Sequence, residues 1–262
     1  MTNSISVPGK HNRVPEVDIE FWLIKLMAVT MGETAADYLA VNLGLGLTTT
    51  SLMMAAVLIV ALFFQFAQKR YVPPVYWAAV VLISIVGTLV TDNLVDNFGV
   101  ALQSTAIAFT ILLAVTFAVW YGSERTLSIH SIFTARREGF YWLAILFTFA
   151  LGTAVGDLVA EVFALGYLTT GILFGAIIAA IAVAYYVFKA NAILCFWLAY
   201  ILTRPLGASF GDLLSQPVEY GGLGFGTIIT SLLFLAAIIG IVIFMTVRYK
   251  PDDGDLDMQR DV

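Results

Sequence analysis

Eight long apolar runs constrain this chain more than any other feature of its sequence. They lie at approximately 19–41, 47–68, 74–95, 100–121, 139–161, 167–188, 192–215 and 223–247. A run of about 20 apolar residues is long enough to cross the hydrocarbon core of a bilayer as a helix. A backbone in lipid must satisfy its own hydrogen bonds, and these runs lack the alternation of barrel strands. We therefore predict an all-α integral membrane bundle of eight transmembrane helices.

The composition agrees with a membrane protein, since 60% of the residues are hydrophobic and 12% are charged. A typical soluble domain has roughly twice that charged fraction. The expected partner is the lipid bilayer. No basic groove or nucleic-acid motif accompanies the net charge of −5, so nucleic acid is not expected. Cys195 is the one cysteine, which excludes an intrachain disulfide. A homo-oligomer stays open.

Positive charge predicts the topology. Eleven of the thirteen Lys and Arg residues lie in the termini and in the connections 68–74, 121–139 and 188–192, and none lies in the short glycine-bearing turns. The positive-inside rule then puts both termini in the cytoplasm. No secretory signal is expected, because the first apolar run is full-length. The predicted organisation is a cytoplasmic arm (1–18), a four-helix half (19–121), a cytoplasmic linker (122–138), a second half (139–247) and an acidic cytoplasmic tail (248–262).

A fourfold internal repeat underlies the eight runs. Each copy reads aromatic-Trp-x9-Gly-x4-Asp, with the tryptophans at 22, 77, 142 and 197. The repeat places its glycine and aspartate at Gly32/Asp37, Gly87/Asp92, Gly152/Asp157 and Gly207/Asp212. The tryptophans are 55, 65 and 55 residues apart, which indicates two halves of two helical hairpins each. All hairpins then have the same orientation, with a pseudo-symmetry axis along the membrane normal rather than an inverted repeat.

Residues four apart share a helix face, so the repeat also predicts which helices face inward. One residue after the glycines stand Glu33, Thr88, Thr153 and Ala208; nine residues after them stand Val41, Asp96, Glu161 and Gln216. The first helix of each repeat therefore carries a polar stripe in its outer half, whereas the second is nearly pure apolar. We expect the first helices inside and the second helices against lipid. Seven carboxylates then converge, namely Glu33, Asp37, Asp92, Asp96, Asp157, Glu161 and Asp212.

Carboxylates inside a bilayer need partners, because facing lipid costs each of them several kcal/mol. Like charges this close also require protons or cations. We therefore predict an ion site in which the metal ligands are Glu33, Asp37, Asp92, Asp157 and Asp212. The predicted counter-charges are Arg204 and Lys25, the latter close enough to its helix start to snorkel to the cytoplasmic interface. The predicted supporting polar residues are Thr88, Thr153, Asn42, Asn97 and Gln216.

Simpler interpretations stand beside these. The aspartates can serve helix-end or interhelical hydrogen bonds, and Asp96 and Glu161 lie nearest the outer surface. Arg204 can form a fixed salt bridge, and Asn42 and Asn97 can simply end helices. The four glycines predict close helix packing, and the four tryptophans predict an aromatic belt near the cytoplasmic interface.

Oxygen ligands without His or Cys favour hard cations, namely Mg²⁺, Ca²⁺ or Mn²⁺, or else protons and Na⁺. We expect a transporter that moves such a cation, with or without coupling to protons. The alternatives are a cation channel of the same architecture and a non-transport regulatory or scaffold protein. No cofactor is expected beyond the cation as substrate. No enzyme is expected either, because the sequence has no HExxH motif.

The stretch "FWLIKLMAVTMGETAADYLAVNLGLG" and its three weaker copies resemble an uncharacterised family of bacterial polytopic membrane proteins built from a repeat of unknown function. Some members carry the label "membrane-anchored protein predicted to be involved in regulation of amylopullulanase". The resemblance covers about 14 to 250, and "GETAADYL" is its most specific part. Thr153 and Ala208 depart from the glutamate of the first copy. The resemblance implies a bacterial inner-membrane location and no established activity.

Overall fold

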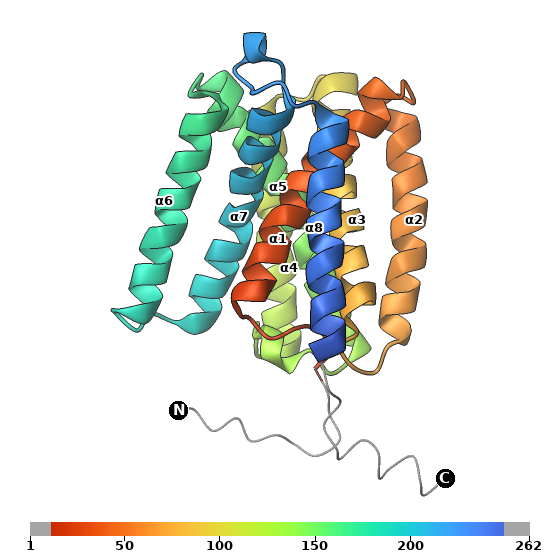
Figure 1. Cartoon of the computed structure of the whole chain (residues 1–262). Helices are drawn as coiled ribbons and strands as arrows, with labels where there is room; N and C mark the ends of the chain where they lie inside the picture. The colour runs from red at the N-terminus through yellow and green to blue at the C-terminus, as the bar shows by residue number, and fades with distance from the viewer. Residues whose placement is uncertain (1–11, 249–262) are drawn as a thin grey trace, which may run out of the picture.

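The computed structural model describes residues 12–248, and within this range the chain is all α-helical with no strand. The predicted arm (1–18) lies partly outside the described residues, and the predicted acidic tail (248–262) lies almost wholly outside them. Eight long helices run up and down the bundle (Figure 1). They are α1 (Ile19–Asp37), α2 (Leu47–Ala67), α3 (Pro73–Asp92), α4 (Leu102–Glu124), α5 (Ala135–Asp157), α6 (Gly166–Tyr186), α7 (Ala192–Ser215) and α8 (Thr227–Arg248).

Seven of the described helices, all but α1, are long and apolar enough to cross a membrane. The length and composition of these helices are those of a multi-pass membrane protein in a lipid bilayer. The helix α1 carries Glu20, Lys25, Glu33 and Asp37 among its 19 residues. Two of these charged residues, Glu33 and Asp37, line the cavity at the end of the bundle.

The inner layer is a closed ring of four helices. α1 packs on α3, α3 on α5, α5 on α7, and α7 back on α1. Most residues of α3 and α5 are buried, whereas α2, α6 and α8 are largely exposed. The predicted division into inward first helices and outward second helices is therefore confirmed. It follows from the polar stripe, because only the first helices carry groups that must be kept out of lipid.

The outer helices connect the repeats in a way that the sequence does not reveal. Each outer helix packs mainly on the inner helix of the next repeat: α2 on α3, α4 on α5, α6 on α7, and α8 on α1. A repeat is thus a hairpin along the chain, but its two helices pack against different inner helices. The contact of α3 with α5 also crosses the boundary between the two predicted halves. The last outer helix closes the ring on the first inner helix.

The repeated glycines are points of close helix contact. A Cβ atom on Gly32 would lie 2.0 Å from Ser84 Oγ on α3, and one on Gly87 would lie 2.7 Å from Phe149 Cβ on α5. On Gly152 it would lie 2.3 Å from Arg204 Cγ, and on Gly207 2.5 Å from Val29 Cγ1. Each glycine therefore meets the next inner helix around the ring. The predicted packing role is confirmed.

The substitution Gly87→Ala should destabilise the bundle by about 1–3 kcal/mol, because the added methyl group overpacks a contact that includes the backbone of α5. Thermal unfolding in detergent measures the loss. The matched control is Gly240→Ala on the outer helix α8, where a Cβ atom would meet nothing within 4 Å. There we expect no loss, since alanine has the higher helix propensity. Equal melting temperatures for Gly87→Ala and the wild type would contradict the packing role.

The end of the bundle where the inner helices begin is closed by aromatic side chains. Trp77, Trp142 and Trp197 are each less than 5% exposed, so the predicted aromatic belt is wrong for these three. Their ring nitrogens donate inside the bundle, to Tyr71 Oη, Glu138 Oε1 and the Leu127 carbonyl, respectively. The indole rings therefore lie between the helices rather than at the lipid interface.

Candidate ion-binding site

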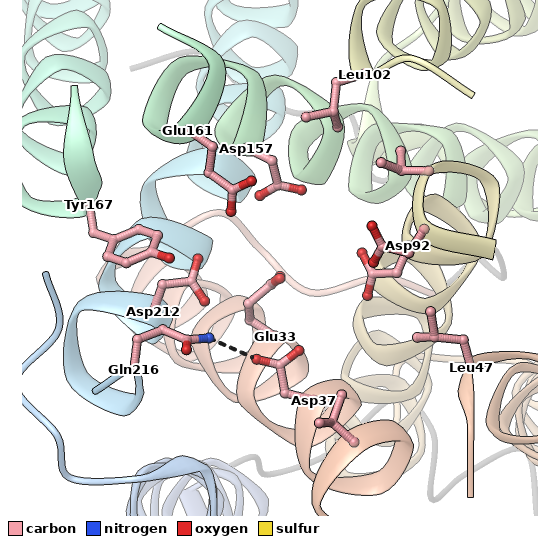
Figure 2. A pocket seen from close by; sticks show the side chains of 13 residues that line it. Glu33, Asp37, Leu47, Asp92, Leu102, Asp157, Glu161, Tyr167, Asp212 and Gln216 are labelled. Carbon is pink, nitrogen blue, oxygen red and sulfur yellow. Dashed lines mark hydrogen bonds between the residues drawn. The ribbon is translucent and has the colours of Figure 1, made fainter. Parts of the chain in front are cut away.

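At the opposite end of the ring, where the inner helices finish, lies a cavity of about 220 Å³ (Figure 2). All four inner helices contribute carboxylates to its wall. It is lined by Glu33, Asp37, Asp92, Asp96, Asp157, Glu161 and Asp212, together with Val41, Leu47, Val95, Leu102, Tyr167 and Gln216. The predicted convergence of the seven acids is confirmed. Their role as ion ligands stays a prediction.

Local helix geometry helps to present the aspartates. Asp37, Asp92 and Asp157 are the last α-helical residues of their helices, and each is followed by a five-residue π-helical turn. Such turns are rare and frequently occur at functional sites. The fourth aspartate, Asp212, differs, because α7 continues to Ser215 without a π-helical turn.

Three of the four aspartates have no hydrogen-bond or ion-pair partner among residues 12–248. In the described range, the side chains of Asp92, Asp157 and Asp212 accept no hydrogen bond and pair with no cation, while Asp37 Oδ2 accepts one bond from Gln216 Nε2 at 3.3 Å. Figure 2 shows the labelled carboxylates turned toward the common space. The alternative that these aspartates serve helix-end or interhelical hydrogen bonds is therefore wrong for three of them. Asp96 and Glu161 are exposed at the rim.

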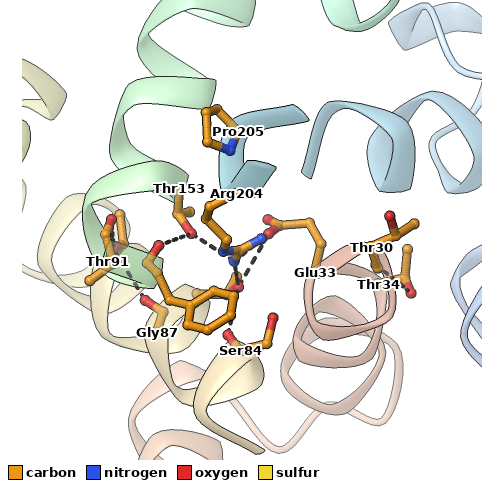
Figure 3. Close-up of polar contacts among 12 residues, drawn as sticks. Thr30, Glu33, Thr34, Ser84, Gly87, Thr91, Thr153, Arg204 and Pro205 are labelled. Atoms are coloured by element: carbon orange, nitrogen blue, oxygen red, sulfur yellow. Dashed lines mark hydrogen bonds and ion pairs between the residues drawn. The ribbon is translucent and has the colours of Figure 1, made fainter. Parts of the chain in front are cut away.

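The floor of the cavity is a layer around the Arg204 guanidinium (Figure 3). Arg204 is fully buried, and its Nη2 lies 2.8 Å from Glu33 Oε2. The same nitrogen donates to Thr153 Oγ1 at 2.8 Å and to Thr88 Oγ1. Thr88 Oγ1 in turn donates to Glu33 Oε2 at 3.2 Å. Glu33, Thr88 and Thr153 occupy equivalent positions in three repeats, and Arg204 completes the layer where the fourth repeat has Ala208.

The Arg204 guanidinium is only partly satisfied. Its Nε and Nη1 are buried and have no hydrogen-bond partner within the described part of the chain. A guanidinium has five N–H donors, so most of them are unused here. The ring of Phe149 supplies a further contact, with its centroid 5.6 Å from Arg204 Cζ. Arg204 is thus the counter-charge that the sequence predicts, and its Nη2 pairs with one acid, Glu33.

Lys25 does not behave as predicted. Its side chain is 1% exposed, and its Nζ donates to the Tyr200 carbonyl at 2.9 Å and to Thr203 Oγ1. Nζ also lies 3.9 Å from the centroid of the Tyr200 ring. It neither snorkels to the interface nor pairs with a carboxylate of the described residues. The reason is its register: Lys25 stands seven residues, or two turns, before Gly32, so it shares the inward face of α1.

The predicted supporting residues divide into two groups. Thr88 and Thr153 form the floor, and Gln216 lines the wall. Asn42 and Asn97 instead form helix-end hydrogen bonds outside the cavity lining: Asn42 Oδ1 accepts from Thr227 Oγ1 at 2.9 Å, and Asn97 Nδ2 donates to Asn93 Oδ1 at 2.7 Å. These two asparagines are therefore helix-ending residues, as the simpler interpretation predicted.

Sequence reasoning missed Tyr167, the second residue of α6, which lines the cavity from an outer helix. A signal was present, because no other outer helix has a tyrosine in its first turn. The second helix of each repeat is nearly pure apolar, and a single phenol at a helix start does not change that average.

The acids do not form a ready-made chelate. No group of three His, Cys, Asp or Glu side chains among residues 12–248 is arranged to hold a metal ion. The five predicted metal ligands line one cavity, yet no three of their carboxylates are close enough together to bind one metal ion. Carboxylates held apart across a polar cavity are suited to a cation that keeps part of its water shell, or to protons.

The fourfold repeat is also evident in comparisons with known proteins. A family model described as Repeat of Unknown Function (DUF347) matches the chain four times, at residues 21–71, 75–126, 140–191 and 195–250. Each match contains one inner and one outer helix. No curated protein and no solved structure matches the chain.

Proposed function

This chain belongs to the family of the Repeat of Unknown Function (DUF347), and from that premise we propose that it is a membrane transporter that moves a hard cation through the carboxylate-lined cavity. All eight helices cross the bilayer in this proposal. The four repeats are related by an axis along the membrane normal, which the closed ring of inner helices supports. The membrane is a bacterial inner membrane, both termini are cytoplasmic, and the cavity opens to the outer side.

One observation carries the proposal: Asp92, Asp157 and Asp212 face a shared cavity and have no partner in the described range. Seven acids surround one guanidinium there. Ionised carboxylates in a membrane bundle without compensating positive charge are strongly disfavoured, so the cavity needs cations or protons from outside the protein. An anion or a neutral apolar substrate would leave that charge uncompensated.

The floor of the cavity favours a carrier over a channel. Below the carboxylates lie buried Arg204, Phe149, Lys25 and Tyr200 on the inner helices, and the aromatic layer closes the far end. A channel needs a continuous polar path, whereas a carrier needs a site that is accessible from one side at a time. Arg204 serves as a tethered cation that holds Glu33 while the cavity has no substrate.

The substrate class follows from the ligand atoms. Carboxylates and hydroxyls favour Mg²⁺, Ca²⁺ or Mn²⁺, and the lack of a ready-made chelate among the described residues favours an ion that keeps several water ligands. Protons can neutralise the acids that the ion leaves unpaired. No catalytic reaction is part of this proposal.

A thermal-shift panel tests cation binding. We expect Mn²⁺, Mg²⁺ or Ca²⁺ to raise the melting temperature of the purified protein, with about 2.7 kcal/mol of stabilisation at about 100 times the dissociation constant. The double variant Asp92→Asn/Asp157→Asn should lose this shift. Glu219→Gln, an exposed acid outside the cavity, should keep it. A wild-type protein that no cation stabilises, or a double variant with an undiminished shift, would contradict the proposal.

A further inference from the structure

The segment 12–17 runs across the end of the bundle opposite the cavity, beneath the start of α1 (Figure 1). It has no helical structure, yet Val14 is only 2% exposed and belongs to the hydrophobic core. A segment that leads into the first helix of a membrane bundle has no need to be buried. We call this segment the strap.

Backbone and amide hydrogen bonds fix the strap to two connections between repeats. Tyr71 N, between α2 and α3, donates to the Asn12 carbonyl at 3.0 Å. Arg13 N donates to the Ile132 carbonyl, between α4 and α5, at 3.0 Å. The Asn12 side chain adds two bonds, donating to the Ile129 carbonyl at 3.0 Å and accepting from Ile132 N at 3.1 Å. The strap thus joins loops that are far apart in sequence.

An ion pair completes the attachment. Arg13 Nη1 lies 2.7 Å from Glu138 Oε2, and the Glu138 side chain is fully buried in the first turn of α5. Gln65 Nε2 on α2 donates to Glu138 Oε1 at 2.8 Å, and Trp142 Nε1 donates to the same oxygen at 3.4 Å. Arg13 is the only cation that Glu138 meets between residues 12 and 248. Lifting the strap would therefore leave a buried carboxylate without its counter-charge.

On the side of the bundle next to α6, no hydrogen bond or ion pair within residues 12–248 attaches the strap to its neighbours, and this side is hollow. A crevice of about 530 Å³ lies there between the end of the strap, α1, the loop 127–130, α6 and α7. Its lining includes Asp18, Trp22, His130, Tyr185 and Cys195. Cys195 is 8% exposed and is the one cysteine of the chain, so its thiol reports on this crevice without background.

We propose that the strap holds the end of the bundle opposite the cavity closed, and that release of the Arg13–Glu138 ion pair lets this end open at the crevice beside Cys195. We call the strap together with its Arg13–Glu138 ion pair the latch. The latch is a property of the fold and does not depend on cation transport. Its role as the inner gate of a carrier rests on the proposed function. In that role, the strap is released and this end of the bundle opens when the carboxylate cavity closes.

The rate at which a maleimide modifies Cys195 in the purified full-length chain tests the latch. We expect Arg13→Gln and Glu138→Gln to raise that rate by about tenfold or more, since loss of a buried ion pair shifts an equilibrium by more than one order of magnitude. The matched control is Arg136→Gln, which removes a guanidinium that is 66% exposed and lies 3.5 Å from Glu124 Oε1 at the same end of α5. Its rate should equal that of the wild type.

Glu138→Gln keeps the test valid if Arg13→Gln fails to fold, because the charge it leaves behind, on Arg13, is 15% exposed rather than fully buried, and because it retains an acceptor for Gln65. Folding is checked by the melting temperature before labelling. Unchanged Cys195 rates in folded Arg13→Gln and Glu138→Gln proteins would overturn the latch.

A cysteine in the carboxylate cavity separates the latch from the carrier mechanism. Val95→Cys in a Cys195→Ser chain reports on the cavity. If Arg13→Gln speeds modification at Cys195 and slows it several-fold at position 95, both the latch and the alternating carrier are supported. If modification speeds up at Cys195 and stays unchanged at position 95, the latch stands and the alternating carrier falls.

Discussion

The substitution Arg204→Met lowers the free energy of unfolding by about 3–5 kcal/mol, the range expected when one member of a buried ion pair is removed. The loss has two sources. Glu33 would lose, in a nearly closed layer, the guanidinium that now lies 2.8 Å away, and the hydroxyls of Thr88 and Thr153 would lose their shared donor. Thermal or denaturant unfolding in detergent measures the change.

A double-mutant cycle assigns the loss to the pair. Glu33→Gln/Arg204→Met should be more stable than Arg204→Met alone, with a coupling energy of about 0.5–3 kcal/mol, because no uncompensated charge remains. The matched control is Arg248→Met at the exposed pair with Glu20, where the side chain of Arg248 is 72% exposed. There the loss should stay below about 1 kcal/mol. Similar small losses at both arginines would show that Arg204 is not a structural counter-charge.

Cation uptake should fall by about 100-fold in proteoliposomes that contain Asp92→Asn or Asp157→Asn. Each variant loses a charge-assisted interaction between a carboxylate and the cation, worth about 1.5–3 kcal/mol, both when the cation is bound and in the transition state for its movement. Both variants should keep the wild-type melting temperature without added cation, because the two carboxylates have no hydrogen-bond donor in the described structure to lose. Uptake of Mn²⁺, followed by quenching of an enclosed dye, measures the rate.

The controls distinguish the competing functions. Glu219→Gln lies outside the cavity and should transport normally. Normal uptake by the double variant Asp92→Asn/Asp157→Asn would eliminate the transporter proposal. A melting temperature that collapses with every Asp→Asn change, with no dependence on ions, would favour the scaffold alternative. Linear current–voltage behaviour in planar bilayers would favour the channel.

The fourth repeat gives the site its asymmetry. It supplies an aspartate to the ring, as the other repeats do, but it replaces the floor position by Ala208 and the rim acid by Gln216. It alone carries Arg204 and Pro205, and the close contact of Gly152 with both makes room for the guanidinium. A fourfold arrangement of acids with no such change would hold no internal cation. The fourth repeat thus adds a tethered positive group to a ring of four aspartates.

Features that depend on local periodicity are predictable from the sequence. Run lengths gave helices whose bounds differ from the structure by a few residues, as at α5, which begins at Ala135 rather than 139 because Thr134 caps it. The repeat and the spacing of four residues predicted which helices form the inner layer and that seven acids share one cavity. These features follow from hydropathy and from helix geometry, which neighbouring residues alone encode.

Contacts between groups that are distant in the sequence become known only from the three-dimensional structure. The sequence could not show that each outer helix packs on the next repeat, that Glu33 rather than another acid pairs with Arg204, or that Lys25 is buried against Tyr200. Tyr167 and the strap likewise required coordinates. Such contacts depend on which helices become neighbours around the ring and on how far a side chain reaches from one helix to the next. Both are fixed by residues that are distant in the sequence.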